Sequence, residues 1–303
     1  MTVKIGVIVP QGWTREYEGW SAVDAWARTR DLASQVEALG FESVWVFDHF
    51  HTVPRPTLEI TFESFTTLAA LASETRRVRL GHVVLCAGYR NPALTAKMIS
   101  TLDVITDGRM DLGIGAGWKR DEWLAYGYGF PDAPERLAIL KDQLEVITAM
   151  MSEDKATYHG KHHHVDGAIN RPLPVQRPRV PIMVGGNGQN VTWRLAARYA
   201  DELNLDGLPP DEIADALPII RSRCEEIGRD PASLSVSVHV WWESLQQHGQ
   251  QRIDMLGAYG QLGVSRVIGL IRDSVHTDDA LAHLADDARA AGAELEPSTA
   301  LGS

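Results

Sequence analysis

An acid and a histidine follow an apolar run near the N-terminus, in the stretch VWVFDHFH (44–51). The first four residues are types that favour a strand suited to burial, whereas Asp48 and His49 are costly to bury. Histidine titrates near neutral pH and suits proton transfer, and a neighbouring carboxylate can orient its ring. The pair is therefore a candidate for acid–base catalysis, with Asp48 orienting His49. The alternative is a hydrogen-bonded pair that only satisfies the end of a strand.

A glycine-rich turn is the second candidate site. In VGGNGQNVTWRLAARYAD (184–201), residues Gly185, Gly186, Asn187 and Gly188 lead directly into an expected helix. Glycines let the backbone approach a ligand closely, and the first helical N–H groups favour an anion. The turn therefore predicts either a phosphate site or a plain tight turn. Its spacing is not that of a dinucleotide fingerprint, and no Walker lysine follows it.

Two other groups of residues carry weaker signals. His162, His163 and His164 are consecutive, and because successive strand positions point to alternate faces they are poorly placed to bind one metal ion together. We expect them in a solvated loop and predict no metal site. The only cysteines, Cys86 and Cys224, are too few for a disulfide framework and wrongly spaced for zinc. We expect Cys86 to be a small buried side chain.

The elements that must position these residues alternate regularly along the chain. Eight β-then-α units predict parallel strands joined by helices, and the count favours a (β/α)8 TIM barrel over an open doubly wound sheet. We expect one domain over 1–303, with an irregular insertion at 152–178 between the fourth helix and the fifth strand. The expected strands are 3–9, 43–47, 78–85, 110–115, 181–186, 201–207, 234–242 and 265–271, and the expected helices are 22–39, 62–74, 93–106, 134–151, 188–200, 210–228, 249–262 and 277–291.

The barrel prediction also predicts where a site lies, because enzymes with this fold work at the C-terminal ends of the strands. Asp48 and His49 follow the second strand. Trp241 and Trp242 lie at the end of the seventh, where alternation sends one ring over the cavity and the other outward. The further polar or glycine positions at strand ends are Gly115, Ala116, Gly117, Gly185, Gly186, Asn204, Asp206, Glu243, Arg272 and Asp273.

Composition excludes several classes of partner. The formal net charge of −11 argues against broad binding to nucleic acid or to an anionic membrane. No apolar run approaches the roughly 20 residues of a membrane-spanning helix, and the N-terminus lacks the layout of a signal peptide, so we expect a cytoplasmic protein. All six lysines precede residue 162. We expect a homodimer, since dimers are the commonest assembly.

Several segments together resemble the luciferase-like monooxygenase superfamily, and most closely its branch of coenzyme F420-dependent oxidoreductases. The resemblance covers most of residues 3–205, and the run from Tyr89 to Trp118 is its most specific part. The segments that carry it are VWVFDHFHTVP, FESFTTLAALASETRRVRLG, YRNPALTAKMISTLDVITDGRMDLGIGAGW, EWLAYGYGFPDAPERLAIL and PIMVGGNGQNVTWRLAARYADELN.

The resemblance implies a barrel with a planar deazaflavin lying across the strand ends. It implies that Asp48 and His49 contact cofactor and substrate, and that a non-prolyl cis peptide near His82-Val83 supports the back of the ring. It further implies that Gly115, Ala116 and Gly117 let the backbone approach the ring edge, and that the turn Gly185–Gly188 holds the cofactor phosphate.

One departure from the branch bears on the substrate. Sugar-phosphate dehydrogenases of the superfamily have a glutamate where this chain has Trp118, and they hold the sugar phosphate with lysines in the later half, where this chain has none. Glucose 6-phosphate is therefore not the expected substrate. Trp118, with Trp241 or Trp13, favours a flatter or more apolar molecule through stacking.

The resulting hypothesis is hydride transfer between C5 of the deazaflavin and a carbonyl, imine or activated alkene, with the proton handled by His49. An FMN-dependent monooxygenase on the same fold is the closest rival. A metal-dependent barrel hydrolase is suggested only by the step His49-Phe50-His51. The remaining alternative is a non-enzymatic protein that keeps the barrel and binds the cofactor but no longer catalyses the reaction.

Overall fold

The computed structural model describes residues 2–241 and 243–296, so Trp242 lies outside the described residues. In this part of the chain, eight parallel strands close into a barrel, which confirms the predicted fold. β11 pairs with β1 through Lys4 and Arg266, and β3 pairs with β5, so the ring has no free edge. The strands of the ring are β1 (Lys4–Ile8), β2 (Ser43–Val46), β3 (Arg79–His82), β5 (Met110–Gly115), β8 (Ile182–Gly185), β9 (Glu202–Asp206), β10 (Ser235–Val240) and β11 (Arg266–Gly269). The two-residue β4 (Leu85–Cys86) adds to β5.

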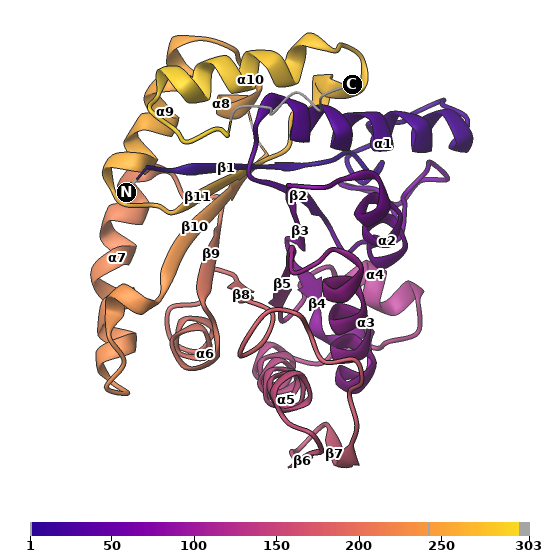
Figure 1. Cartoon of the computed structure of the whole chain (residues 1–303), viewed down its shortest axis with the longest axis vertical. Helices are drawn as coiled ribbons and strands as arrows, with labels where there is room; N and C mark the ends of the chain where they lie inside the picture. Colours follow the sequence, from indigo (N-terminus) through magenta and orange to yellow (C-terminus); the bar gives the residue numbers. More distant parts are fainter. Residues whose placement is uncertain (1, 242, 297–303) are drawn as a thin grey trace.

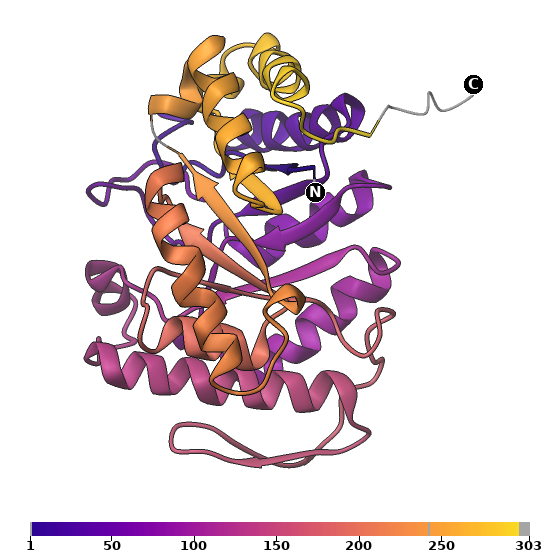
Figure 2. The same ribbon diagram turned by 90° about the vertical axis from the view of Figure 1, so that its left-hand side faces the viewer.

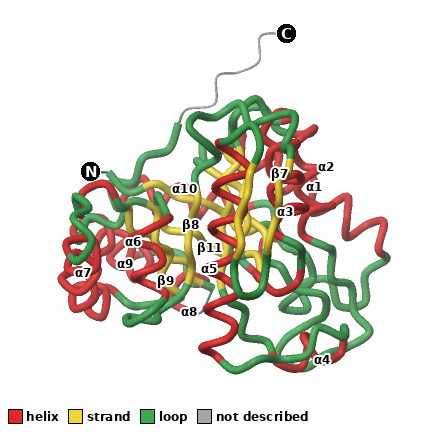
Figure 3. Tube along the Cα trace, turned by 90° about the horizontal axis from the view of Figure 1, so that it is seen from below, coloured by secondary structure: helices red, strands yellow, loops and turns green. Residues whose placement is uncertain are grey.

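Helices form the outer layer around the strands (Figures 1 and 3). The helices that connect successive strands of the ring are α1 (Ala22–Leu39), α2 (Ser64–Glu74), α3 (Pro92–Ile105), α5 (Ala133–Ser152), α6 (Thr192–Tyr199), α7 (Pro210–Glu225) and α9 (Gln250–Gln261), and α10 (Asp279–Ala290) follows the last strand. The short helices α4 (Arg120–Ala125) and α8 (Glu243–Gln246) were not expected from the sequence. Single 3-10 turns lie at Ala87–Tyr89, Pro231–Ser233 and Arg272–Val275.

Local signals explain where the helices begin and end. Ser21 accepts a hydrogen bond from the backbone of Asp24 at the start of α1, and Gly40 ends that helix with a φ of 92°. Positive φ costs glycine little, which suits it to this position. Asn91 caps α3 ahead of a proline at its first position, and Glu63 caps α2. These caps satisfy N–H groups that have no partner inside the helix.

The interior of the barrel is filled in layers. At the N-terminal end, Arg266 forms ion pairs with Glu42, Asp111 and Glu202. Above this layer Trp45 is fully buried, with the guanidinium of Arg266 5.1 Å from its ring centroid. Ile8, Phe47, Val83, Met183, Ile268 and Leu270 pack with Trp45 in one apolar cluster. The lumen is therefore packed up to the level at which the strands end.

The insertion contains regular structure, which corrects the expectation of an irregular segment. β6 (Ala156–His159) and β7 (His164–Ala168) form an antiparallel hairpin that lies outside α5 (Figure 2). Asp142 of α5 accepts hydrogen bonds from the backbone N–H groups of His162 and His163. The histidine run thus forms the turn and the first strand position of the hairpin. No cluster of metal-binding side chains is found among the described residues, and none of the described helices is long and apolar enough to cross a membrane.

Candidate active site

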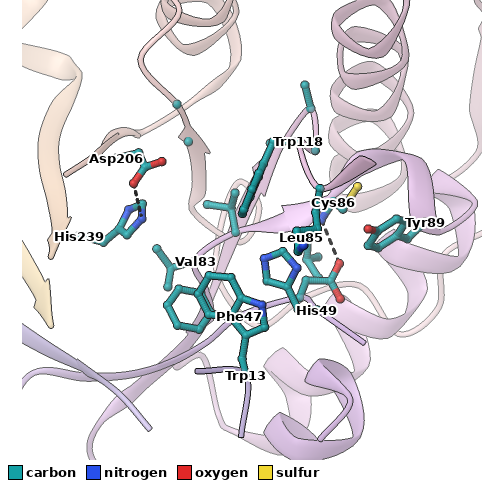
Figure 4. Close-up of a pocket in the computed structure, with 18 of the residues that line it drawn as sticks. Trp13, Phe47, His49, Val83, Leu85, Cys86, Tyr89, Trp118, Asp206 and His239 are labelled. Carbon is teal, nitrogen blue, oxygen red and sulfur yellow. Dashed lines mark hydrogen bonds and ion pairs between the residues drawn. The ribbon is translucent and has the colours of Figure 1, made fainter. Parts of the chain in front are cut away.

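A cavity of about 270 Å³ opens where the barrel strands end (Figure 4). It brings together residues that follow seven of the eight ring strands, separated by up to 228 positions between Trp13 and Trp241. Of the residues predicted from the sequence, those lining it are Trp13, Asp48, His49, Val83, Gly115, Ala116, Gly117, Trp118, Gly185, Gly186 and Trp241. Asp206, one of the strand-end positions noted in the sequence, also lines it, and the further lining residues are Phe47, Val84, Leu85, Cys86, Tyr89, Lys119, Thr192 and His239.

Three predicted site residues lie outside this lining. His82 is fully buried, and its ring packs against that of Phe65 with the ring centroids 4.5 Å apart. Burial lowers its pKa to about 3, and Asp48 opposes this shift only in part. Asn187 and Gly188 are exposed beyond the cavity. The cis peptide lies one residue later than predicted, between Val83 and Val84.

His49 does not have Asp48 as its partner. The Nδ1 atom of His49 lies 2.8 Å from Oε2 of Glu122, which belongs to α4. The ring of Trp13 stacks on the imidazole with the centroids 4.4 Å apart and an interplanar angle of 4°. Trp118 meets it edge-on at 5.9 Å. The imidazole is therefore held by a carboxylate and by aromatic rings, and the prediction that Asp48 orients it is wrong.

Glu122 was not singled out from the sequence. Its side chain is 0% exposed, and it accepts hydrogen bonds from Phe50 N–H at 2.6 Å and from the Tyr89 hydroxyl at 2.9 Å, besides its contact with His49. Burial alone raises the pKa of a carboxyl, but the contacts with His49, Phe50 and Tyr89 outweigh it and hold the pKa of Glu122 below its usual range. Glu122 is therefore ionised at neutral pH.

Asp48 has a different set of partners. It forms a two-point ion pair with Arg90, at 2.7 and 2.9 Å, and accepts hydrogen bonds from the Ser64 hydroxyl and the Cys86 backbone N–H. Burial raises its pKa, but the charge and hydrogen bonds of Arg90 outweigh this effect, so the pKa lies below the usual range. Asp48 thus ties the end of β2 to α2 and to the segment after β4.

The glycines of the cavity wall serve packing as well as access. A side-chain carbon on Gly115 would lie 2.9 Å from a methyl carbon of Val84, and one on Gly185 would lie 2.8 Å from another. The lack of a side chain at both positions is thus what lets Val84 pack between β5 and β8. At Gly186 the φ is +128°, and an added side-chain carbon would meet only Thr192, at 3.5 Å. Here the backbone conformation requires glycine, while the space beside it is open.

The turn after β8 differs from its prediction in one respect. The helix begins at Thr192, four residues later than the expected start at 188, and no side chain caps it. Among the described residues no acceptor is found for the backbone N–H groups of residues 187–191. Asn187 instead uses its side-chain amide, which donates to the backbone O of Asp206 and accepts from its backbone N–H. The turn is anchored to β9, and its N–H groups at 187–191, which have no acceptor in the described part of the chain, can bind an anion.

Across the cavity from His49 and Trp118 lies a second polar group (Figure 4). The Nε2 atom of His239 lies 3.0 Å from Oδ1 of Asp206, and its Nδ1 atom lies 2.7 Å from Oδ1 of Asn204. The hydrogen bond from His239 lowers the pKa of Asp206. Asp206 stands among the strand-end positions noted in the sequence, whereas His239, inside the seventh expected strand, was missed. Its position two residues before Trp241, on the same face of the strand, is the signal that points to it.

The chain is similar in sequence to known proteins of one family. The family profile for luciferase-like monooxygenases matches residues 3–296. An F420-dependent glucose-6-phosphate dehydrogenase from Kineococcus radiotolerans is 31% identical over 263 residues, which cover 85% of this chain and 74% of the relative.

Solved structures share the fold at lower sequence identity. An F420-dependent secondary alcohol dehydrogenase in complex with an F420-acetone adduct matches with a TM-score of 0.78 at 20% identity, covering 91% of this chain and 96% of that one. A monooxygenase from Streptomyces bottropensis matches with a TM-score of 0.67 at 23% identity, covering 95% and 87%. These likenesses support the barrel architecture.

Proposed function

Because the chain belongs to the luciferase-like monooxygenase family, we propose that it is a coenzyme F420-dependent oxidoreductase acting on a small organic substrate. The observation that carries the proposal is that a firmly held imidazole lines the cavity at the strand ends, and that the glycines at its rim lead into residues 187–191, whose backbone N–H groups have no acceptor among the described residues. The 31% identical relative is named as F420-dependent, which favours the deazaflavin over FMN. When bound, the deazaflavin would supply hydride chemistry at its C5 atom.

The residues present fit such a cofactor. Residues 187–191 of the turn offer backbone N–H groups that have no acceptor among the described residues, and Gly186 before them leaves an open approach for a phosphate. Val83, Val84 and Leu85 form an apolar wall against which a planar ring can lie, and Gly115 to Gly117 line the adjacent wall. A flat apolar surface next to a group of backbone donors is what a ring with an anionic tail requires.

His49 would handle the proton that accompanies hydride transfer. It lines the cavity, and its Nε2 atom has no hydrogen-bond partner among the described residues. In the reductive direction a protonated Nε2 would donate to the substrate heteroatom, and in the oxidative direction the neutral ring would accept that proton. A correctly placed general acid contributes typically 10²–10⁴-fold to the rate.

The cavity wall favours a flat or apolar substrate without a phosphate of its own. Trp13, Trp118 and Trp241 all contribute to the lining. The one lysine in that lining, Lys119, already places its ammonium 2.8 and 2.7 Å from the two oxygens of Asp121. Stacking on indole rings therefore supplies the main attraction, and we propose a carbonyl, imine or activated alkene in a planar or hydrophobic molecule.

The proposal is tested by cofactor titration. The purified protein should bind F420, followed by the cofactor's fluorescence, and should bind FMN much more weakly. The variant His49→Ala should still bind F420, while turnover with an accepted substrate falls about 10²–10⁴-fold. Tight FMN binding with no response to F420 would reverse the assignment of the cofactor, and unchanged turnover in His49→Ala would remove the proton role.

A further inference from the structure

We propose that Glu122 is a positioning residue that places the proton of neutral His49 on Nδ1 and leaves the lone pair of Nε2 facing the cavity. The inference rests on the proposed function in one respect, because that function gives His49 a proton to transfer. Glu122 does not line the cavity, so it acts through the imidazole and not on the substrate.

The first step concerns the state of Glu122. Its Oε1 atom accepts the backbone N–H groups of Phe50 and His51, at 2.6 and 3.3 Å, and its Oε2 atom accepts the Tyr89 hydroxyl at 2.9 Å. Burial, with the neighbouring acidic groups, raises the pKa of Tyr89, so its hydroxyl keeps its proton and donates. A buried carboxylate surrounded by donors is stabilised in its ionised form. Glu122 can therefore only accept.

The second step concerns the histidine. Because Glu122 only accepts, the 2.8 Å contact at Nδ1 requires a proton on that atom of His49. Neutral imidazole carries one N–H, so the lone pair lies on Nε2. The stacked ring of Trp13 and the edge of Trp118 restrict rotation of the imidazole out of this orientation. When His49 gains a second proton, the same carboxylate faces the imidazolium and stabilises it.

The variant Glu122→Gln reverses this arrangement with little change in volume. The amide oxygen can still accept from Phe50 and His51, which leaves the amide NH₂ group facing Nδ1. Nδ1 must then accept, so the proton of the neutral ring moves to Nε2. The neutral ring then has no lone pair facing the cavity. In the doubly protonated ring, the N–H at Nδ1 would face the amide NH₂ group, and two donors would meet. We expect kcat to fall about 10²-fold or more, with the substrate KM changed less than threefold, as for other histidines held in the wrong tautomer.

The test reads the tautomer directly. Protein labelled with ¹⁵N at histidine is studied by NMR without cofactor, and His49 is identified by the signals lost in His49→Gln. The wild type should show Nδ1 protonated and Nε2 unprotonated in the neutral ring, and Glu122→Gln should show the reverse. Two matched controls, Tyr89→Phe and Asp121→Asn, should both keep the wild-type tautomer, because Glu122 remains ionised beside Nδ1.

Each outcome bears on one claim. A wild-type spectrum with the proton on Nε2 overturns the inference, and this result needs no variant to fold. An unchanged tautomer in a folded Glu122→Gln also overturns it. The reversed tautomer with unchanged turnover would leave the positioning intact and refute the acid–base role of His49. Failure to bind F420 would refute the proposed cofactor and leave the spectra unaffected.

Discussion

Replacing His82 with leucine should reduce the loss of stability that this protein shows on acidification from about pH 8 to about pH 5. The imidazole is fully buried beside Asp48, Arg90 and Phe65, and burial lowers its pKa from the ordinary 6.5 to about 3. Burial raises the pKa of Asp48, but Arg90 outweighs this effect and holds the pKa below its usual range, so Asp48 is ionised at about pH 5. His82 is therefore neutral in the folded state and takes up a proton on unfolding below about pH 6.5.

The magnitude follows from this difference in pKa. Between about pH 6.5 and pH 3 the unfolded chain binds one more proton at His82, so the free energy of unfolding falls as the pH falls. At about pH 5 the loss relative to pH 8 is ~2 kcal/mol, because ~1.5 pH units below 6.5 each contribute ~1.36 kcal/mol. This figure changes little if the folded-state pKa is about 4 instead of 3, since both values lie well below pH 5.

Urea unfolding at about pH 8 and pH 5 measures the effect. His82→Leu should lose ~2 kcal/mol less than the wild type between these pH values. Both ring nitrogens lack a partner among the described residues, so the apolar substitution leaves no orphaned group behind. Equal pH dependence in wild type and His82→Leu would show that the ring is not held neutral.

Three further substitutions test the scaffold of the site. Arg90→Leu leaves the carboxylate of Asp48, which is 1% exposed, without its ion-pair partner. The free energy of unfolding, measured by urea unfolding, should therefore fall by about 3–5 kcal/mol, and a loss below about 1 kcal/mol would contradict the two-point pairing. Gly186→Ala, at a φ of +128°, should weaken F420 binding in titration while the fold is kept, whereas Gly228→Ala, remote from the cavity, should leave binding intact. Trp118→Ala should change the urea midpoint little, because the side chain is 62% exposed. The same variant should raise KM about tenfold for an aromatic substrate and less for an aliphatic one. Equal changes in KM for the two substrates would refute stacking on Trp118.

The fold was predictable because its signals are local. Each of the eight expected strands overlaps a strand of the ring, and the caps at Ser21, Gly40 and Asn91 lie at the boundaries that the residue types predict. The insertion was less predictable. Its hairpin depends on Asp142, a residue of α5 that accepts from the backbone at His162, and a pairing across 20 positions leaves no trace in local propensity.

The partners inside the site were predictable only in part. The glycine turn, His49 and the three tryptophans lie at strand ends, where the barrel rule places them. Glu122 lies 73 positions from His49, on a six-residue helix that carries too little apolar periodicity to be recognised. Its only signal is an acidic residue shortly after the fourth expected strand. Arg90 pairs with Asp48 across 42 positions and gave no signal at all.

One of the corrections could have been reached from the sequence, since strand periodicity argues against a contact between Asp48 and His49. Side chains alternate across a strand, so Trp45 and Phe47 point into the lumen, whereas Val44 and Val46 pack against the helices. Continuing the alternation sends Asp48 toward the helices, where Arg90 neutralises it, and His49 toward the cavity. A buried strand can therefore end on two polar groups because each finds its own compensation, one in the scaffold and one at the site. By the same rule, the orienting carboxylate of a strand-end histidine belongs on another element, which is where Glu122 lies.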